Sequence, residues 1–226
     1  MTPKQTASKI IAELKRKYPA PECALIHQSP WQLLVATVLS AQCTDKRVNM
    51  VTPALFKKYA TPAAFARAKQ SDLEKAIHST GFFRNKAKNI IACAQTLIEK
   101  YGGEIPQNIE DLTSLPGVGR KTASVILGTA FGKAEGIVVD THVTRLSNRM
   151  GLTEQNDAVR IEKDLMQIIP KKHWIEFSHL LILHGRERCS ARKPDCENCE
   201  INHLCARRCV SRHAPTYHLG QMGQRP

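Results

Sequence analysis

Helical spacing of apolar residues recurs along almost the whole chain, and runs of strict alternation between apolar and polar residues are hard to find. A period near 3.6 residues indicates amphipathic helices, whereas a period of two would indicate strands. Most of the helical segments also begin at a plausible N-cap and stop at a glycine or a proline. The sequence therefore predicts an all-α fold.

The predicted helices follow one another with short loops between them. The segment from Trp31 to Gln42 is apolar on every side, so we expect it to be buried. The pair Ser29-Pro30 before it is typical of a cap and a first turn. The predicted helices cover residues 6–17, 31–42, 141–150, 157–169 and 173–184, with further starts at Thr44, Thr61, Ser71 and near Asn85.

The chain has 226 residues, enough for one large domain or two small ones. Its helical pattern loosens after Gly132 and passes through the apolar residues 137–139. We therefore expect two helical domains: a six-helix domain over residues 23–133, and a second domain made of residues 1–22 and 134–211. Residues 212–226 show little periodicity, and we expect them to form a flexible tail.

The composition is basic, with 33 Lys and Arg against 20 Asp and Glu and a formal charge of +13. Such a charge favours polyanionic partners such as nucleic acid, although a solvated basic surface would have the same composition. No apolar run approaches the about 18 residues of a membrane span, and no secretory signal is visible at the N-terminus. We expect a monomer in the cytoplasm, associated with the nucleoid if the source is bacterial.

Five of the eight cysteines crowd into residues 189–209. Clustering without a secretory signal indicates metal binding rather than disulfides. Four thiolates can ligate one ion or one cluster, and a structural zinc site is the generic alternative. We expect Cys209 to be a bystander, and the four candidate ligands, spaced C-x6-C-x2-C-x5-C, are Cys189, Cys196, Cys199 and Cys205.

The most informative segment reads LPGVGRK, from Leu115 to Lys121, where a helical pattern breaks and restarts at once. We expect Gly117 and Gly119 to adopt backbone conformations closed to other residues and to turn the chain tightly between two helices. The free N–H groups of this hairpin and of the next helix would then bind a phosphate. An ordinary turn between helices is the alternative, and the basic pair Arg120-Lys121 argues against it.

This hairpin, the stretch VVDTH from Val138 to His142 and the cysteine cluster together resemble the endonuclease III family of the helix-hairpin-helix DNA glycosylases. The resemblance runs from about Cys23 to Cys205, with three motifs in the same order. It implies a bifunctional DNA N-glycosylase and AP lyase that excises oxidised pyrimidines from duplex DNA in base excision repair. It also implies a [4Fe–4S] cluster in the cysteine loop.

The resemblance implies that Lys121 is the nucleophile and Asp140 its catalytic partner. A lysine amine that attacks the sugar C1′ forms an imine, and the imine makes the C2′ proton acidic enough for β-elimination of the 3′ phosphate. Water as the nucleophile would release the base and stop there. Asp140 is also well placed to cap the helix that begins at Thr141, and both roles can hold together.

Base flipping leaves a gap in the duplex that a side chain has to fill. The resemblance implies that Gln42 fills it, and that residues 81–86 form a second intercalating loop with Phe82 where the family commonly has leucine. Packing in the core is the alternative for Phe82 and Phe83. The other expected DNA contacts are Leu115, Gly117, Val118, Gly119, Arg120, His142, Arg186, Arg192 and Lys193, with a solvated charge run as the alternative for the last three.

Two other functions fit parts of this pattern. The adenine-specific mismatch glycosylase shares the hairpin, the aspartate and the cluster, but it lacks the lysine and carries an added recognition domain. Lys121, and a chain that ends soon after the cysteines, argue against it. A non-catalytic DNA-binding module on the same scaffold is disfavoured because both Lys121 and Asp140 are present.

Overall fold

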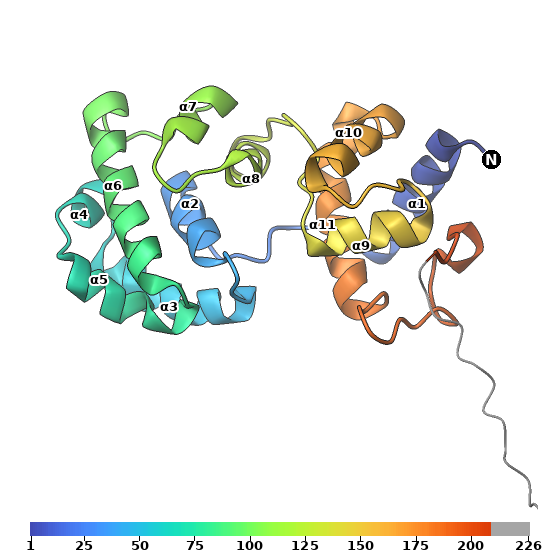
Figure 1. The fold of residues 1–226 in the computed structure, drawn as a ribbon, viewed down its shortest axis with the longest axis horizontal. Helices are drawn as coiled ribbons and strands as arrows, with labels where there is room; N and C mark the ends of the chain where they lie inside the picture. Colours follow the sequence, from blue (N-terminus) through green and yellow to red (C-terminus); the bar gives the residue numbers. More distant parts are fainter. Residues whose placement is uncertain (209–226) are drawn as a thin grey trace, which may run out of the picture.

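The computed structural model describes residues 1–208, and every regular element within them is a helix (Figure 1). The prediction of an all-α fold is confirmed. Cys209 and the expected tail, 212–226, lie outside the described residues. In Figure 1 the chain starts in one lobe, crosses to a second lobe, and then returns to the first. No helix within residues 1–208 is both long and apolar enough to cross a membrane.

Helices α2 to α8 form the lobe that the chain enters second (Figure 1). This range holds seven α-helices, one more than the six expected for residues 23–133, because two of them are only five and six residues long. The helices are α2 (Pro30–Leu39), α3 (Asp45–Lys58), α4 (Pro62–Ala66), α5 (Gln70–Ile77), α6 (Phe83–Tyr101), α7 (Ile109–Ser114) and α8 (Arg120–Phe131), with the 3-10 turn η1 (His78–Thr80) before α6.

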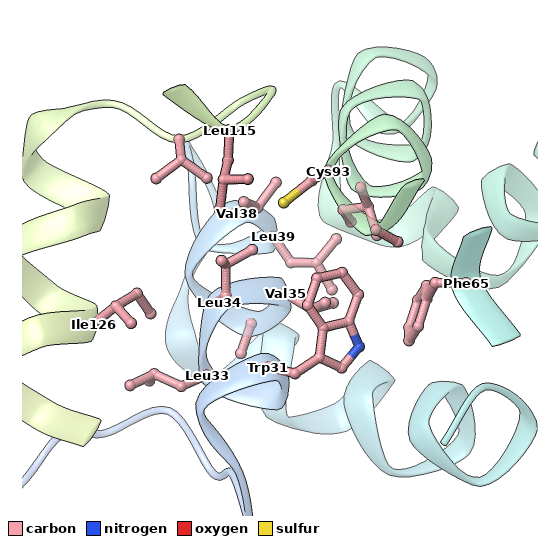
Figure 2. Packing of buried hydrophobic residues seen from close by; sticks show 14 of the residues in the cluster. Trp31, Leu33, Leu34, Val35, Val38, Leu39, Phe65, Cys93, Leu115 and Ile126 are labelled. Atoms are coloured by element: carbon pink, nitrogen blue, oxygen red, sulfur yellow. The ribbon is translucent and has the colours of Figure 1, made fainter. Parts of the chain in front are cut away.

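The core of this lobe surrounds α2, whose apolar side chains point toward several neighbouring helices in Figure 2. Ser29 caps the helix by accepting a hydrogen bond from the Gln32 N–H at 3.2 Å. Trp31 packs edge-on against Phe65 of α4, with the ring centroids 5.4 Å apart. The predicted burial is confirmed for α2, since Leu34 and its neighbours are fully buried, and each such side chain stabilises the fold by about 1.5–3 kcal/mol. It is wrong for Ala41 and Gln42, which follow the helix and are exposed.

The other lobe combines the N-terminal helix with the helices of the C-terminal half. Its core joins Ile10 and Leu14 to Leu146, Phe177 and Leu181. This core shares no residue with the core around α2, and we propose that the two cores define two domains that meet near residues 132–136. The elements are α1 (Pro3–Lys17), α9 (Thr141–Met150), α10 (Ala158–Ile168), η2 (Lys171–His173), α11 (Trp174–Glu187) and η3 (Asn202–Leu204).

Three predicted helix ends differ from the structure by three residues. Helix α11 runs on to Glu187 instead of ending at residue 184, and the other two differences have reasons visible in the local hydrogen bonds or backbone angles. Helix α1 begins at Pro3 rather than Thr6, because the Thr2 hydroxyl accepts from the Gln5 N–H at 3.3 Å while the Gln5 side chain accepts from the Thr2 N–H at 2.9 Å. This reciprocal capping box starts the helix earlier. Helix α2 ends at Leu39, because Gln42 has a φ of 52° in the left-handed region and cannot be helical.

Candidate DNA-binding and catalytic site

The loop between α7 and α8 is a tight hairpin. The Val118 N–H donates to the Leu115 carbonyl at 3.1 Å, which closes the turn. Gly117 has a φ of 76°, and a Cβ added there would lie 2.7 Å from Cβ of Asn89, so this position requires glycine. The same expectation for Gly119 is wrong, because its φ of −87° is open to any residue and a Cβ would meet nothing within 4 Å.

The hairpin side chains and the hairpin backbone face different ways. Leu115 and Val118 are 2% and 5% exposed and belong to the core, so a contact with DNA from either residue has to come from the backbone. Gly119 is the N-cap of α8 and offers no capping side chain. The N–H groups of the first turn of α8 are therefore free for an anion at the positive end of the helix dipole.

Lys121 lies in the first turn of α8, and its side chain is exposed. Within residues 1–208 it has no side-chain hydrogen bond and no ion pair. Arg120, directly before it, reaches Glu162 of α10 at 3.7 Å between nitrogen and oxygen. Because α10 belongs to the other lobe, this contact shows that the N-terminus of α8 faces the lobe made of α1 and α9 to α11.

Asp140 is the N-cap of α9. Its Oδ1 accepts a hydrogen bond from the Val143 N–H at 2.8 Å, and its backbone carbonyl accepts from the Thr144 N–H at 2.8 Å. The capping interpretation of Asp140 is confirmed. The side chain is only partly buried, and Oδ2 has no hydrogen-bond partner among the described residues, so the carboxylate keeps one free oxygen.

Charged groups from both lobes gather around His142. Burial lowers the pKa of His142, Asp140 and Asp45 raise it, and Arg145 and Arg186 lower it further. The net effect is a lowered pKa, so His142 is neutral at physiological pH. Arg186 of α11 forms an ion pair with Asp45, the first residue of α3, and this pair joins the two lobes beside the α9 N-terminus. The structure thus brings Asp140, His142 and Arg186 together.

The two residues expected to enter the duplex lie on exposed loop tips. Gln42 and Phe82 have φ values of 52° and 47°, and Phe82 is 62% exposed. Core packing is therefore excluded for Phe82. It applies instead to Phe83, which is half-buried and stacks on His78 with the ring centroids 4.4 Å apart.

The four candidate cysteine ligands line one cavity in the lobe made of α1 and α9 to α11. Two of their sulfurs accept hydrogen bonds: Cys189 from the Arg149 guanidinium at 3.2 Å and Cys205 from the Arg207 N–H at 3.4 Å. Such donors stabilise thiolates that ligate a metal. Within residues 1–208 no three His, Cys, Asp or Glu side chains lie close enough together to hold a single ion, so a centre that these four thiols share has to span the cavity.

Arg149 and Arg145 were missed by the sequence reasoning, yet both hold the cysteine loop. Arg149 is 6% exposed and donates to the carbonyls of Ser190 at 2.7 Å and Ala191 at 2.8 Å. Arg145 donates to the Cys189 carbonyl at 3.0 Å. The sequence feature that could have identified both arginines is their spacing from His142, since residues 142, 145 and 149 lie on one face of a helix.

The basic residues of the cysteine loop differ in their surroundings. Arg192 and Lys193 are exposed on a tight turn in which the Ser190 hydroxyl bonds to both backbone groups of Lys193. Neither has an ion-pair partner within residues 1–208. Arg188, by contrast, pairs with Asp195 at 3.2 Å and with Glu200 at 3.3 Å. Arg192 and Lys193 are therefore the cations of this loop that are best placed for phosphate.

Residues 35–171 match the HhH-GPD superfamily of base excision DNA repair proteins, and residues 189–205 match the iron-sulfur binding domain of endonuclease III. Over 202 residues the chain is 55% identical to endonuclease III of a Synechocystis strain, which covers 89% of this chain and 92% of that relative. The chain belongs to the endonuclease III family. It is also 47% identical to endonuclease III of Bacillus subtilis over 189 residues, 83% of this chain and 86% of the relative.

Solved structures agree with this assignment to the endonuclease III family. A trapped covalent intermediate of endonuclease III with DNA has a TM-score of 0.85 and 46% identity, and it covers 91% of this chain and 96% of its own. A thermostable thymine-DNA glycosylase with a TM-score of 0.80 and 23% identity, covering 89% of this chain and 96% of its own, shares the fold.

The enzyme is a DNA glycosylase with AP lyase activity that works in base excision repair. Its cofactor is a [4Fe–4S] cluster, which sets aside the zinc alternative. The cavity lined by four cysteines fits this group, because a [4Fe–4S] cluster takes four thiolates. The non-catalytic module is likewise set aside.

Proposed function

We propose that the enzyme removes oxidised pyrimidines from duplex DNA and that Lys121 is its nucleophile. The observation that carries the proposal is the position of Lys121: it is exposed on the first turn of α8, directly after the hairpin and next to Arg120, which contacts α10 of the other lobe. A phosphate held by the hairpin N–H groups would bring the neighbouring sugar next to this amine. The relative described as a trapped covalent intermediate with DNA supports covalent catalysis.

In the proposed reaction the neutral Lys121 amine forms a bond to C1′ while the bond between C1′ and the base breaks. The base leaves with the electron pair and takes up a proton. The sugar ring then opens at O4′ as the imine forms between C1′ and the lysine nitrogen. Loss of the C2′ proton sends its electron pair into a new C2′–C3′ double bond, and the 3′ phosphate leaves from C3′. Water finally hydrolyses the imine and restores the lysine.

We assign Asp140 to the positive charge that develops at C1′ as the base departs. Its free Oδ2 carries negative charge at the inter-lobe face, while Oδ1 is held in place by the Val143 N–H. A carboxylate fixed in this way stabilises the charge without having to reorganise. His142, which burial keeps neutral, adds no competing charge next to it.

The proposed DNA contacts fall into two groups. Gln42 and Phe82 fill the gap left by the flipped nucleotide. Phosphates bind the N–H groups of Gly117 and Gly119 and the free side chains of Arg192 and Lys193, whereas the N–H groups of Leu115 and Val118 already donate to the carbonyls of Leu112 and Leu115 and so support the hairpin rather than bind DNA. His142, Arg120 and Arg186 lie at the same face, but both arginines first have to exchange a carboxylate partner for a phosphate. Because both lobes of the site belong to one chain, we propose that the enzyme acts as a monomer.

The proposed cluster ligands are Cys189, Cys196, Cys199 and Cys205. When bound, the cluster supplies four bonds that fix residues 189–205 and so fix the turn that carries Arg192 and Lys193. Burial raises the pKa of the Cys199 thiol to about 11, so this thiol loses its proton only on metal binding. The lysine chemistry at C1′ requires no metal.

Borohydride trapping on duplex DNA with a thymine glycol tests the substrate class and the nucleophile together. The wild-type enzyme should form a covalent adduct, and Lys121→Gln should bind abasic-site DNA without forming an adduct or a strand break, because an amide cannot form the imine. Lys9→Gln, an exposed lysine on α1, is the control for the lost charge. Wild-type nicking by Lys121→Gln would show that the nucleophile is another residue.

A further inference from the structure

Lys86 on α6 is the one buried lysine within residues 1–208, with 5% of its surface exposed. Its ammonium donates to two backbone carbonyls, of Leu39 and of Thr80, each at 2.8 Å. Burial lowers the pKa of Lys86, and no carboxylate among the described residues pairs with it. Burying a cation without an anionic partner is costly, so an ammonium at this position needs a compensating role.

The two carbonyls are the ends of two helical segments. Leu39 is the last residue of α2, and Thr80 is the last residue of η1. Carbonyls at a helix C-terminus lack an intrahelical partner and carry partial negative charge. One ammonium therefore caps two helical segments that lie far apart in the sequence.

The residues that follow these two ends are the proposed wedges. Gln42 comes three residues after Leu39, and Phe82 comes two residues after Thr80. Both are exposed and both have left-handed backbones, with φ values of 52° and 47°. The Lys86 N–H also donates to the Phe82 carbonyl at 3.1 Å. Strained backbones of this kind persist only where their surroundings hold them.

We propose that Lys86 is a positioning residue that fixes the distance between the two intercalating loops, so that Gln42 and Phe82 enter the same gap in the duplex together. This inference rests on the proposed role of Gln42 and Phe82. Without the ammonium the two loops lose their common anchor. Steps that require an opened duplex should then slow down, while chemistry on a nucleotide that is already free should not.

The experiment compares Lys86→Met with Lys100→Met, which removes the same charge from the exposed far end of α6. Borohydride trapping rates are measured on an abasic site in duplex DNA and on the same site in a single strand. We expect Lys86→Met to lose about tenfold to a hundredfold on the duplex and to stay within about twofold on the single strand, since a misplaced group typically costs this much. Lys100→Met should match the wild type on both.

Two further measurements keep the inference testable. Fluorescence of 2-aminopurine beside the abasic site reports flipping without any chemistry, and its rise on binding should be smaller for Lys86→Met. Lys86→Gln, which keeps one amide donor, replaces the methionine variant if that variant does not fold. A folded variant that slows equally on both substrates, or flips normally, overturns the positioning role. Failure of the proposed nucleophile looks different, because Lys121→Gln would then trap both substrates whatever Lys86→Met does.

Discussion

At the residue scale, Asp140 combines a helix cap with a proposed catalytic charge, and two substitutions separate these roles. Asparagine caps a helix as well as aspartate does, so Asp140→Asn should change the free energy of unfolding by less than about 0.5 kcal/mol. Asp140→Asn also removes the negative charge that stabilises the positive charge at C1′, and base excision should therefore slow about 10²- to 10³-fold. Urea denaturation and single-turnover excision measure the two effects.

Asp140→Ala is the matched partner of this variant, because it removes both the charge and the cap. It should be about 1 kcal/mol less stable than Asp140→Asn while excising at a similar rate. If Asp140→Asn instead keeps wild-type excision, the carboxylate acts only as a cap.

The sequence predicted some residues of the site and missed others for a physical reason. Lys121 and Asp140, whose proposed roles came from the resemblance to the endonuclease III family, lie within short local motifs that can be matched along the chain. Lys86 and Arg149 act through backbone carbonyls of segments remote in sequence, namely Leu39 and Ser190. Carbonyls are present at every position, so no residue pattern marks the partner of such a contact.

At the scale of the elements, the hairpin between α7 and α8 offers a comparison of two neighbouring glycines. Gly117→Ala should destabilise the fold by about 2 kcal/mol, because alanine is strained at a φ of 76° and its Cβ would press on Asn89. Gly119→Ala should cost less, about 0.5–1 kcal/mol, since its backbone is ordinary and the space around it is open, and only the poorer N-cap preference of alanine counts against it. Thermal and urea unfolding of both variants measure the difference; equal losses would show that the turn does not depend on a left-handed residue.

For α2 and α9, the helix boundaries were predicted correctly where a local cap sets them and wrongly where tertiary contacts set them. The interior of α2 followed from its continuous apolar residues, and the start of α9 followed from the cap at Asp140. The end of α2 did not, because Gln42 is a good helix former and only its tertiary surroundings hold it in a left-handed conformation. The helix propensity of a residue does not show where tertiary contacts force it out of a helix.

At the scale of the whole molecule, the two lobes meet through opposite charges. The N-terminus of α8 contacts α10 through Arg120 and Glu162, and α11 contacts α3 through Arg186 and Asp45. Lys121 on α8 and Arg192 and Lys193 on the cysteine loop are among the exposed cations that have no ion-pair partner within residues 1–208. Each pair neutralises one cation and one anion, so the net charge of +13 is unchanged by them, and Arg120 and Arg186 become available to DNA only when their pairs open.

The salt dependence of DNA affinity tests how many cations of the enzyme contact phosphates. With about five cationic phosphate contacts, the logarithm of the affinity should fall against the logarithm of the salt concentration with a slope of about −4.5. Arg192→Gln should reduce the magnitude of the slope by about 0.9, since one phosphate contact is lost. Lys9→Gln removes the same charge from the exposed face of α1 and should leave the slope unchanged. Fluorescence anisotropy on an undamaged duplex from low to moderate salt gives all three slopes.

Equal slopes for the Arg192 and Lys9 variants would mean that DNA affinity depends on the net charge of the enzyme rather than on particular contacts. A slope near zero would exclude phosphate binding as the source of affinity.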